Sequence, residues 1–332
     1  MQVHPVVDAH LDLPGEIYYR QGRGEKDIIK NHYLAHFEEA GIALVVAAVY
    51  VESSDLPEKG LRIALRQINA LLEEIESMPD RLLLVKSAAD IDRVLAEKRI
   101  GFVLHLEGLD PLGSDVNLLR TFHSLGVRSA SLTWSRRNAF GEGCCRAGQD
   151  IQIEGHLSQA GRDAIATMEK MGILLDISHL NDDGIADVMA DAAKKPYFAS
   201  HSNCRSVHRH YRNITDKQIR HMATQGGVLG LNAYKSIVGA TPGTAEAIGM
   251  CCDHVERMWD IGGEDAAGIG LDLCDSYYEA VEGHVQTQSD CLKHHGELVL
   301  VTAELLARGH GEEKIAKWLG GNFIRFFQQT WR

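Results

Sequence analysis

The chain has 332 residues, 45% of them hydrophobic and 24% charged, which is enough apolar material for a large folded core. Its formal net charge of −12 argues against nucleic acid as the main partner, because a polyanion is bound by a basic face. No stretch approaches the roughly 20 apolar residues that span a bilayer, and the first residues lack the pattern of a secretion signal. The seven cysteines match neither a zinc knuckle nor a disulfide framework. We therefore expect a cytoplasmic protein with reduced thiols and no membrane partner.

One rhythm repeats along the chain: a short apolar run, a polar loop and then an amphipathic stretch. The apolar runs predict eight strands, at Val3–Val7, Ala43–Tyr50, Gly101–Leu106, Arg128–Leu132, Ile173–Ile177, Tyr197–Ala199, Val228–Leu231 and Gly268–Leu271. A weaker run, Leu82–Val85, predicts either an extra strand or part of a long connection.

Helical patterns lie between these runs. The segment His156–Met171 carries one apolar stripe at 3.6-residue spacing. Thr215 and Gln218 have the spacing of a capping box, which predicts a helix over Thr215–Thr224. Asn181, followed by two aspartates, predicts another helix start, because the helix dipole favours negative charge there.

Strands that alternate with helices indicate βαβ units and a parallel sheet. Eight such units in one unbroken chain favour a closed (β/α)₈ barrel, a TIM barrel of class α/β, formed as a single domain over residues 1–332. An open, doubly wound sheet remains the alternative. The chain has no G-x-G-x-x-G loop after its first strand, which makes a dinucleotide-binding sheet less favourable.

Three histidines and three carboxylates follow the predicted strands directly. They are His10 and Asp12 after the first strand, Glu107 after the third, His179 after the fifth, His201 after the sixth and Asp272 after the eighth. Each alone is weak evidence for a metal site, but in a barrel these strand ends converge on the face that holds the active site. Three imidazoles and three carboxylates are too many for one closed tetrahedral site and suit two ions with open positions. Such ligands fit Zn²⁺ best, with Mn²⁺, Co²⁺ and Fe²⁺ as alternatives.

Other polar residues in these regions suggest supporting or different roles. Asp8, His105 and Asp176 lie inside the apolar runs, so we expect them to orient metal ligands rather than to bind an ion. No serine lies in a G-x-S-x-G elbow, and no cysteine has the setting of a nucleophile. The segment 201–212, HSNCRSVHRHYR, is rich in basic residues and suits the binding of a small anion.

Several segments resemble the membrane (renal-type) dipeptidase family, peptidase family M19, a branch of the amidohydrolase-like barrels. The matching segments are DAHLDLP at 8–14, LEGLDPL at 106–112, GILLDISHLN at 172–181, FASHSNCRSV at 198–207, YRNITDKQI at 211–219 and GGNFIRFF at 320–327. They cover nearly the whole chain, and several are long enough to be specific.

The resemblance implies a role for each strand-end residue. His10 and Asp12 would bind one zinc ion, His179 and His201 the other, and Glu107 would bridge the two. A hydroxide between the ions would attack the peptide carbonyl. The proton-transfer residue would be Asp272, and Arg212 would pair with the C-terminal carboxylate of a small peptide substrate. The family often forms homodimers, although nothing in this sequence marks an interface.

Two departures from the family pattern bear on the substrate. Where family members carry a histidine after the fourth strand, which contacts the oxygen of the scissile carbonyl, this chain has Trp134. Its indole can donate one hydrogen bond but carries no charge, so we expect help from Arg137 or Asn138. The family's D-F-D-G segment after the eighth strand is here Asp272-Leu273-Cys274-Asp275, which keeps only the first aspartate in register.

The leading hypothesis from the sequence is a dinuclear zinc dipeptidase that acts on L-L and also on L-D dipeptides. The first alternative is a hydrolase of another amide or of a lactone on the same metal site, which Trp134 and the altered loop favour. The second alternative is a non-catalytic metal-binding protein. The complete set of strand-end ligands argues against this last reading.

Overall fold

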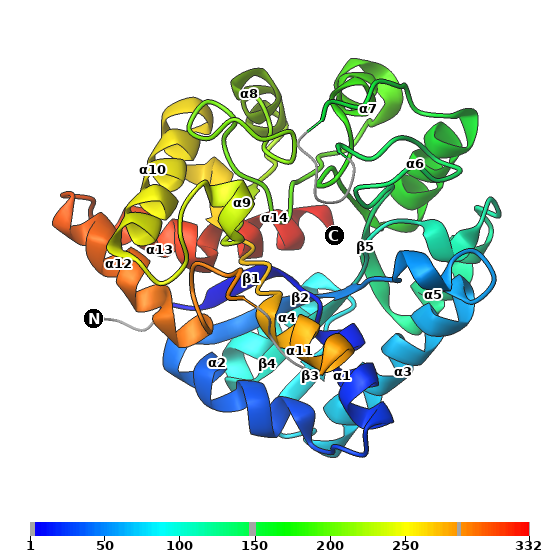
Figure 1. Cartoon of the computed structure of the whole chain (residues 1–332), viewed down its shortest axis with the longest axis horizontal. Helices are drawn as coiled ribbons and strands as arrows, with labels where there is room; N and C mark the ends of the chain where they lie inside the picture. Colours follow the sequence, from blue (N-terminus) through cyan, green and yellow to red (C-terminus); the bar gives the residue numbers. More distant parts are fainter. Residues whose placement is uncertain (1–3, 146–150, 284–286, 332) are drawn as a thin grey trace.

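The computed structural model describes residues 4–145, 151–283 and 287–331 (Figure 1). Its strands form one parallel sheet with the neighbour order β6-β5-β4-β2-β1-β8-β7, and β3 pairs with β4. The strands are β1 (Val6–Leu11), β2 (Ile42–Val49), β3 (Leu82–Leu84), β4 (Ile100–Leu106), β5 (Val127–Ser131), β6 (Leu174–Asp176), β7 (Leu229–Leu231) and β8 (Ala267–Ile269).

The segment Tyr197–Ala199, predicted as the sixth strand, closes this sheet into a barrel. Phe198 forms a parallel bridge with Asp176 of β6, and Ala199 forms one with Leu229 of β7. The Phe198 carbonyl accepts a hydrogen bond from Ile177 at 2.9 Å on the β6 side. The predicted (β/α)₈ barrel is thereby confirmed, although this strand is reduced to two bridged residues.

The sequence left open whether Leu82–Val85 is an extra strand or part of a long connection. The structure shows an extra strand, β3. It pairs with the first half of β4, residues Ile100–Phe102. β5 pairs with the second half of β4, residues Leu104–Leu106, while β2 pairs along the length of the strand. β3 therefore extends the sheet beside the barrel without taking a place in its ring.

The first strand begins and ends later than predicted. Residues 1–3, and with them the start of the predicted Val3–Val7 strand, lie outside the described residues, and β1 runs over Val6–Leu11. Every residue of β1 is buried, including the polar Asp8 and His10. Asp8 does not end the strand, because its carboxylate accepts hydrogen bonds inside the protein, from the Leu271 amide at 2.9 Å among others.

Helices surround the strands and occupy the periphery of the view (Figure 1). They are α1 (Leu13–Gly22), α2 (Leu34–Ala40), α3 (Gly60–Ser77), α4 (Ala88–Glu97), α5 (Leu118–Leu125), α6 (Gln159–Met171), α7 (Asp182–Asp187), α8 (Asp216–Thr224), α9 (Lys235–Val238), α10 (Ala245–Gly262), α11 (Asp275–Glu282), α12 (Leu298–Ala307), α13 (Glu312–Ala316) and α14 (Asn322–Thr330). Within the described ranges, no helix has both the length and the apolar character needed to cross a membrane.

Side-chain hydrogen bonds set the starts of the helices that the sequence predicted. Thr215 and Gln218 form the complete capping box of α8, and Asn181 caps α7 by accepting a bond from the Gly184 amide at 2.9 Å. α6 begins at Gln159, three residues later than predicted. The hydroxyl of Ser158 accepts from the Gly161 amide at 3.0 Å and so fixes that start.

Alternate residues of the central strands pack on opposite faces of the sheet. Leu44 and Val46 of β2 belong to a cluster that contains Phe323 and Phe327 of α14, whereas Val45 belongs to the cluster formed with most of the surrounding helices. α14, drawn in red, passes behind the strands in Figure 1. One end of the barrel is thus filled by apolar side chains, which leaves the carboxyl ends of the strands for polar groups.

Candidate active site

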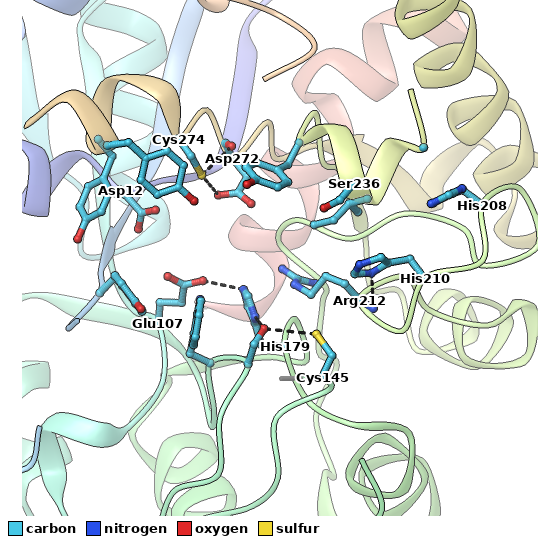
Figure 2. Close-up of a pocket in the computed structure, with 18 of the residues that line it drawn as sticks. Asp12, Glu107, Cys145, His179, His208, His210, Arg212, Ser236, Asp272 and Cys274 are labelled. Carbon is cyan, nitrogen blue, oxygen red and sulfur yellow. Dashed lines mark hydrogen bonds and ion pairs between the residues drawn. The ribbon is translucent and has the colours of Figure 1, made fainter. Parts of the chain in front are cut away.

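A cavity of about 810 Å³ opens where the strands end, and it is lined by side chains from the loops that follow them (Figure 2). Six of the predicted site residues line it: Asp12, Glu107, Trp134, His179, Arg212 and Asp272. His10 and His201 lie beneath them and are fully buried. The barrel therefore brings the strand-end residues together on one face, as expected from the sequence.

The carboxylate of Glu107 lies among three imidazoles. Its Oε1 is 2.8 Å from Nε2 of His179, 3.4 Å from Nε2 of His201 and 3.7 Å from Nε2 of His10. The Nε2 atoms of His179 and His201 are 3.0 Å apart. Glu107, His10 and His201 thus form a group whose ligand atoms lie close enough together to hold a metal ion.

A second group of candidate ligands surrounds His10. Its Nε2 lies 3.9 Å from Asp12 Oδ1 and 3.9 Å from Asp272 Oδ1. Among the described residues, both ring nitrogens of His10 and the Oδ1 of Asp12 have no hydrogen-bond partner although they are buried. Buried polar atoms without partners cost free energy, and a cation held by His10 and Asp12 would satisfy them. The side chains present therefore fit a metal centre.

Serine hydroxyls fix the orientation of two imidazoles. Ser135 Oγ lies 2.7 Å from Nδ1 of His179, and Ser200 Oγ lies 2.6 Å from Nδ1 of His201. Both contacts leave Nε2 facing Glu107. Such partners on the far nitrogen are what metal-binding histidines have.

Asp176 and His105 support the same residues from inside the barrel. Asp176 accepts hydrogen bonds from the Ser200 hydroxyl and from the Ser200 amide, the latter at 3.0 Å. His105 Nδ1 lies 3.0 Å from Ser129 Oγ, and its Nε2 lies 3.6 Å from Asp176 Oδ2. Asp176 therefore acts on His201 through Ser200, which is an orienting role.

The backbone at two site residues lies in the left-handed region. The φ angle of His179 is 68° and that of Asp272 is 55°. Residues other than glycine rarely adopt these angles, and they concentrate at functional sites. The carboxylate of Asp272 also accepts a hydrogen bond from Asn232 Nδ2 at 2.8 Å. Asn232 was not among the predicted site residues, although it follows β7 directly, which is the position the predicted residues have on their own predicted strands.

Arg212 reaches the cavity with part of its guanidinium unused. Its side chain is almost completely buried, and Nη1 donates to Ser202 Oγ at 2.6 Å. Nη2 is buried and has no hydrogen-bond partner among the described residues. A substrate carboxylate is the group that would satisfy this nitrogen and balance its charge.

Trp134 forms part of the cavity wall and stacks on a metal-ligand candidate. Its ring centroid is 5.7 Å from that of His179, at an interplanar angle of 29°. The guanidinium of Arg136 lies 5.2 Å from the Trp134 ring centroid and donates to the Val51 carbonyl at 2.8 Å. Trp134 is therefore in contact with both Arg136 and His179. The sequence showed its position but not these partners.

The structure does not bring Asn138 into this cavity. Its side-chain amide donates to the Leu132 carbonyl at 2.8 Å, and its Oδ1 accepts from the Phe140 amide at 2.9 Å. These bonds occupy Asn138 in shaping its own loop. Arg137, the other group considered there, is exposed and pairs with Glu142. Neither residue takes the place of the missing family histidine.

Burial sets the charge states of the site. Burial lowers the pKa of His10, His179 and His201 well below the usual value, and the neighbouring positive charge of Arg212 lowers it further. Burial also raises the pKa of Asp12 and Glu107, and the carboxylates around them add to this effect. Neutral imidazoles are the form that binds metal, and a cation relieves the repulsion between crowded carboxylates.

The sequence is similar to known dipeptidases over almost its full length. Dipeptidase tcpJ of Claviceps purpurea is 27% identical over 313 residues, which cover 92% of this chain and 70% of that protein. Dipeptidase verJ of Clonostachys rogersoniana is 28% identical over 340 residues, which cover 97% of this chain and 83% of that protein.

Solved structures of dipeptidases share the fold. The dipeptidase AC, a metallopeptidase of family M19, superposes with a TM-score of 0.86 at 27% identity, and the match covers 99% of both chains. A metallopeptidase from Rhodobacter sphaeroides, which holds a phosphinate mimic of the dipeptide L-Ala-D-Ala, superposes with a TM-score of 0.85 at 27% identity and the same coverage. The family model for membrane dipeptidases matches residues 1–331. This chain therefore belongs to the membrane dipeptidase family, peptidase family M19, and is a metallo-dipeptidase.

Proposed function

We propose that this protein hydrolyses dipeptides with two zinc ions bound at the carboxyl ends of the barrel strands. The position of Glu107 carries the proposal, because its Oε1 lies 2.8 to 3.7 Å from the Nε2 atoms of three histidines. His179 and His201 would hold one ion, His10 and Asp12 the other, and Glu107 would bridge them. Imidazole and carboxylate ligands suit Zn²⁺, and they also accept Mn²⁺, Co²⁺ or Fe²⁺.

The metal centre would supply the nucleophile. Metal ions held by these residues would supply an activated water and polarise the carbonyl of the substrate. The protein holds its ligands in place before substrate binds, through Ser135 and Ser200 on the far nitrogens of His179 and His201. Such preorganisation avoids a rearrangement during the reaction.

Asp272 would transfer the proton. Its Oδ1 lies 3.9 Å from Nε2 of His10, while its Oδ2 accepts a hydrogen bond from Asn232 at 2.8 Å. Burial raises the pKa of Asp272. A carboxylate with a raised pKa accepts a proton more readily and can then donate it, as proton transfer requires. In this role Asp272 accepts the proton of the attacking water and delivers it to the leaving amine.

Arg212 would select dipeptides. Its Nη2 has no partner among the described residues, and Figure 2 shows Arg212 to the right of Glu107 and Asp272. Arg212 can therefore pair with a carboxylate while the scissile bond lies at the metal centre. A longer peptide has no carboxylate at that distance. A charge-assisted bond to the C-terminal carboxylate therefore explains a limit of two residues.

We extend the proposal to L-D as well as L-L dipeptides. The support is the relative from Rhodobacter sphaeroides, which holds a mimic of L-Ala-D-Ala and shares 27% of its sequence with this chain. A cavity of about 810 Å³ is large enough for either configuration at the C-terminal residue.

The direct test is hydrolysis of a panel of L-L and L-D dipeptides by protein reconstituted with zinc, compared with chelated protein. We expect metal-dependent cleavage of dipeptides, and none of dipeptide amides, N-acetylated dipeptides or tripeptides. Metal analysis of the same samples should give two ions per chain. Cleavage that survives chelation would contradict the metal mechanism.

A second candidate function is hydrolysis of another amide or of a lactone at the same centre. Trp134 favours it, because an uncharged indole takes the place of the histidine that contacts the carbonyl oxygen in the family. Two bound metals without cleavage of any dipeptide would favour this candidate.

We also propose a cytoplasmic location. The support is that no disulfide joins any of the seven cysteines, all of which are buried. Fractionation of cells that express the protein, followed by immunoblotting, tests this. Recovery in an exported or membrane fraction would overturn it.

A further inference from the structure

The cavity has a basic end that the dipeptidase reaction described above does not use. The loop between Cys204 and Ile214 brings His208, Arg209 and His210 to the cavity wall, next to Arg212. This is the basic segment whose sequence suits a small anion. Arg212 accounts for one carboxylate only, which leaves His208 and Arg209 without a role in that reaction.

This loop is held firmly at its base. Cys204 and Ile214 form a parallel bridge, and the buried Asn213 donates to the carbonyls of His208 at 3.0 Å and Ile237 at 2.9 Å. Arg205 forms two hydrogen bonds with Asp182, at 2.6 and 2.9 Å. The basic side chains are therefore presented by a braced loop.

His208 and Arg209 differ in how they are held. Gly239 has a φ angle of 83°, and a Cβ at this position would lie 2.4 Å from His208 Nδ1. His208 thus packs directly on the end of α9, and Ser236 of the same helix also lines the cavity. Arg209 is exposed, lines the cavity and makes no ion pair with any described residue. Its charge is available to a ligand.

The charges of the cavity are separated along its length. Figure 2 shows Asp12, Glu107 and Asp272 on one side of Arg212, and His208 and His210 on the other. A dipeptide with its scissile bond at the metal centre and its C-terminal carboxylate on Arg212 has its C-terminal residue nearest the basic end. The side chain of that residue can then extend toward His208 and Arg209.

We propose that His208, Arg209 and Ser236 form a second anion subsite, which binds the side-chain carboxylate of the C-terminal residue. The preferred substrates are therefore dipeptides that end in aspartate or glutamate. This inference rests on the proposed dipeptidase function and names its substrate class. Hydrogen bonds to charged groups are strong enough for discrimination of about tenfold between a carboxylate and the neutral amide of the same shape.

The test uses substrate pairs that differ only in charge. Holoenzyme is assayed with Ala-Asp against Ala-Asn and with Ala-Glu against Ala-Gln, each with an L or a D residue at the C-terminus. We expect kcat/KM to be about tenfold higher for the acidic member of at least one pair, and the ratio to fall as salt is added. Equal or higher kcat/KM for the amides in every pair overturns the proposal.

Two variants test the residues. In Arg209→Gln the ratio of acidic to amide substrate should fall toward one, and His208→Gln should lower it as well. The matched control is Arg220→Gln, which removes the same charge from an exposed position on α8 outside the cavity and should keep the wild-type ratio. A wild-type ratio in both Arg209→Gln and His208→Gln also overturns the subsite.

Binding of the free products separates this proposal from the dipeptidase function itself. Calorimetric titration of holoenzyme with aspartate and with asparagine, in both configurations, needs no turnover. We expect aspartate to bind about tenfold more tightly and Arg209→Gln to remove the difference. Cleavage of dipeptides together with equal product affinities defeats the subsite alone, whereas failure to cleave any dipeptide defeats the proposed function.

Discussion

His295 Nε2 lies 2.8 Å from Asp8 Oδ2, and both side chains are buried. The other oxygen of Asp8 accepts hydrogen bonds from the amides of Leu271 at 2.9 Å and His10 at 3.3 Å. His295 therefore ties the loop before α12 to the ends of β1 and β8. These two strands carry His10 and Asp272 into the site, so a residue remote in sequence holds the geometry of the metal centre.

Replacing His295 should lower stability. His295→Ala leaves the buried carboxylate of Asp8 with one partner fewer, which costs about 1–3 kcal/mol. Urea unfolding of the two proteins measures the difference. His295→Gln keeps a donor at this position and should recover part of the loss; a His295→Ala protein as stable as the wild type would show that Asp8 does not depend on this bond.

Glu107→Ala should release both ions, because a bridging ligand serves two sites. Glu107→Gln keeps the shape but loses the charge, and should retain fewer ions than the wild type. Glu52→Gln is the control, since Glu52 lines the same cavity but bonds to Tyr277 at 3.0 Å. Metal analysis after gel filtration measures the number of ions bound per chain. Two ions retained by Glu107→Ala would rule out the bridge.

Asp272→Asn should keep its metals and lose turnover. The amide preserves the size of the side chain and its contact with Asn232, but it cannot accept and deliver a proton. We expect kcat to fall by about 10²–10⁴, the usual contribution of a general acid–base group. Steady-state kinetics and metal content are measured on the same preparation, and near-normal kcat with both metals bound would remove the proton-transfer role.

Arg212→Ala should lower kcat/KM for dipeptides by roughly 100-fold or more, because a buried charge-assisted contact is worth 2–5 kcal/mol. Arg212→Lys keeps the charge but loses the paired geometry, so its kcat/KM should lie between those of the wild type and of Arg212→Ala. Dipeptide amides lack the carboxylate and should be cleaved by neither protein, so the loss should be seen only with dipeptides that have a free C-terminal carboxylate. Unchanged hydrolysis of dipeptides by Arg212→Ala would favour the amide or lactone alternative.

His254 should make stability depend on pH. Its Nε2 lies 3.1 Å from the Val238 carbonyl, its Nδ1 accepts from the Cys204 amide at 3.3 Å, and burial lowers its pKa to about 4. Because the unfolded chain has a histidine pKa of about 6.5, protonation favours unfolding. The stability that neutral His254 contributes is complete above pH 6.5 and is lost as the pH falls toward 4.

The comparison of wild type with His254→Gln measures this contribution. At pH 7.5 the variant should be less stable by urea unfolding, and the difference should shrink by about 2 kcal/mol between pH 7.5 and 5. A difference that stays constant over this range would mean that His254 does not titrate on unfolding.

The sequence by itself determined the barrel and which strand-end residues meet at its mouth. Strand ends in a parallel barrel converge on one face whatever the loops do, so His179, His201 and Glu107 could be placed together from their positions alone. The capping bonds of Thr215 and Asn181 were equally local, because their partners lie three residues away.

Only the tertiary structure decided what depends on distant contacts. The length of β1 could not be read from its sequence, because Asp8 is satisfied by His295, 287 residues further along the chain. The sequence predicted that Asn138 contacts the substrate, but in the structure its side-chain amide donates a hydrogen bond to the Leu132 carbonyl. Likewise, the sequence showed that Trp134 replaces a histidine, but its contact with both Arg136 and His179 requires side chains from different loops to meet. Local patterns fix elements and their ends, whereas the partners of buried polar groups are set by the packing of the whole chain.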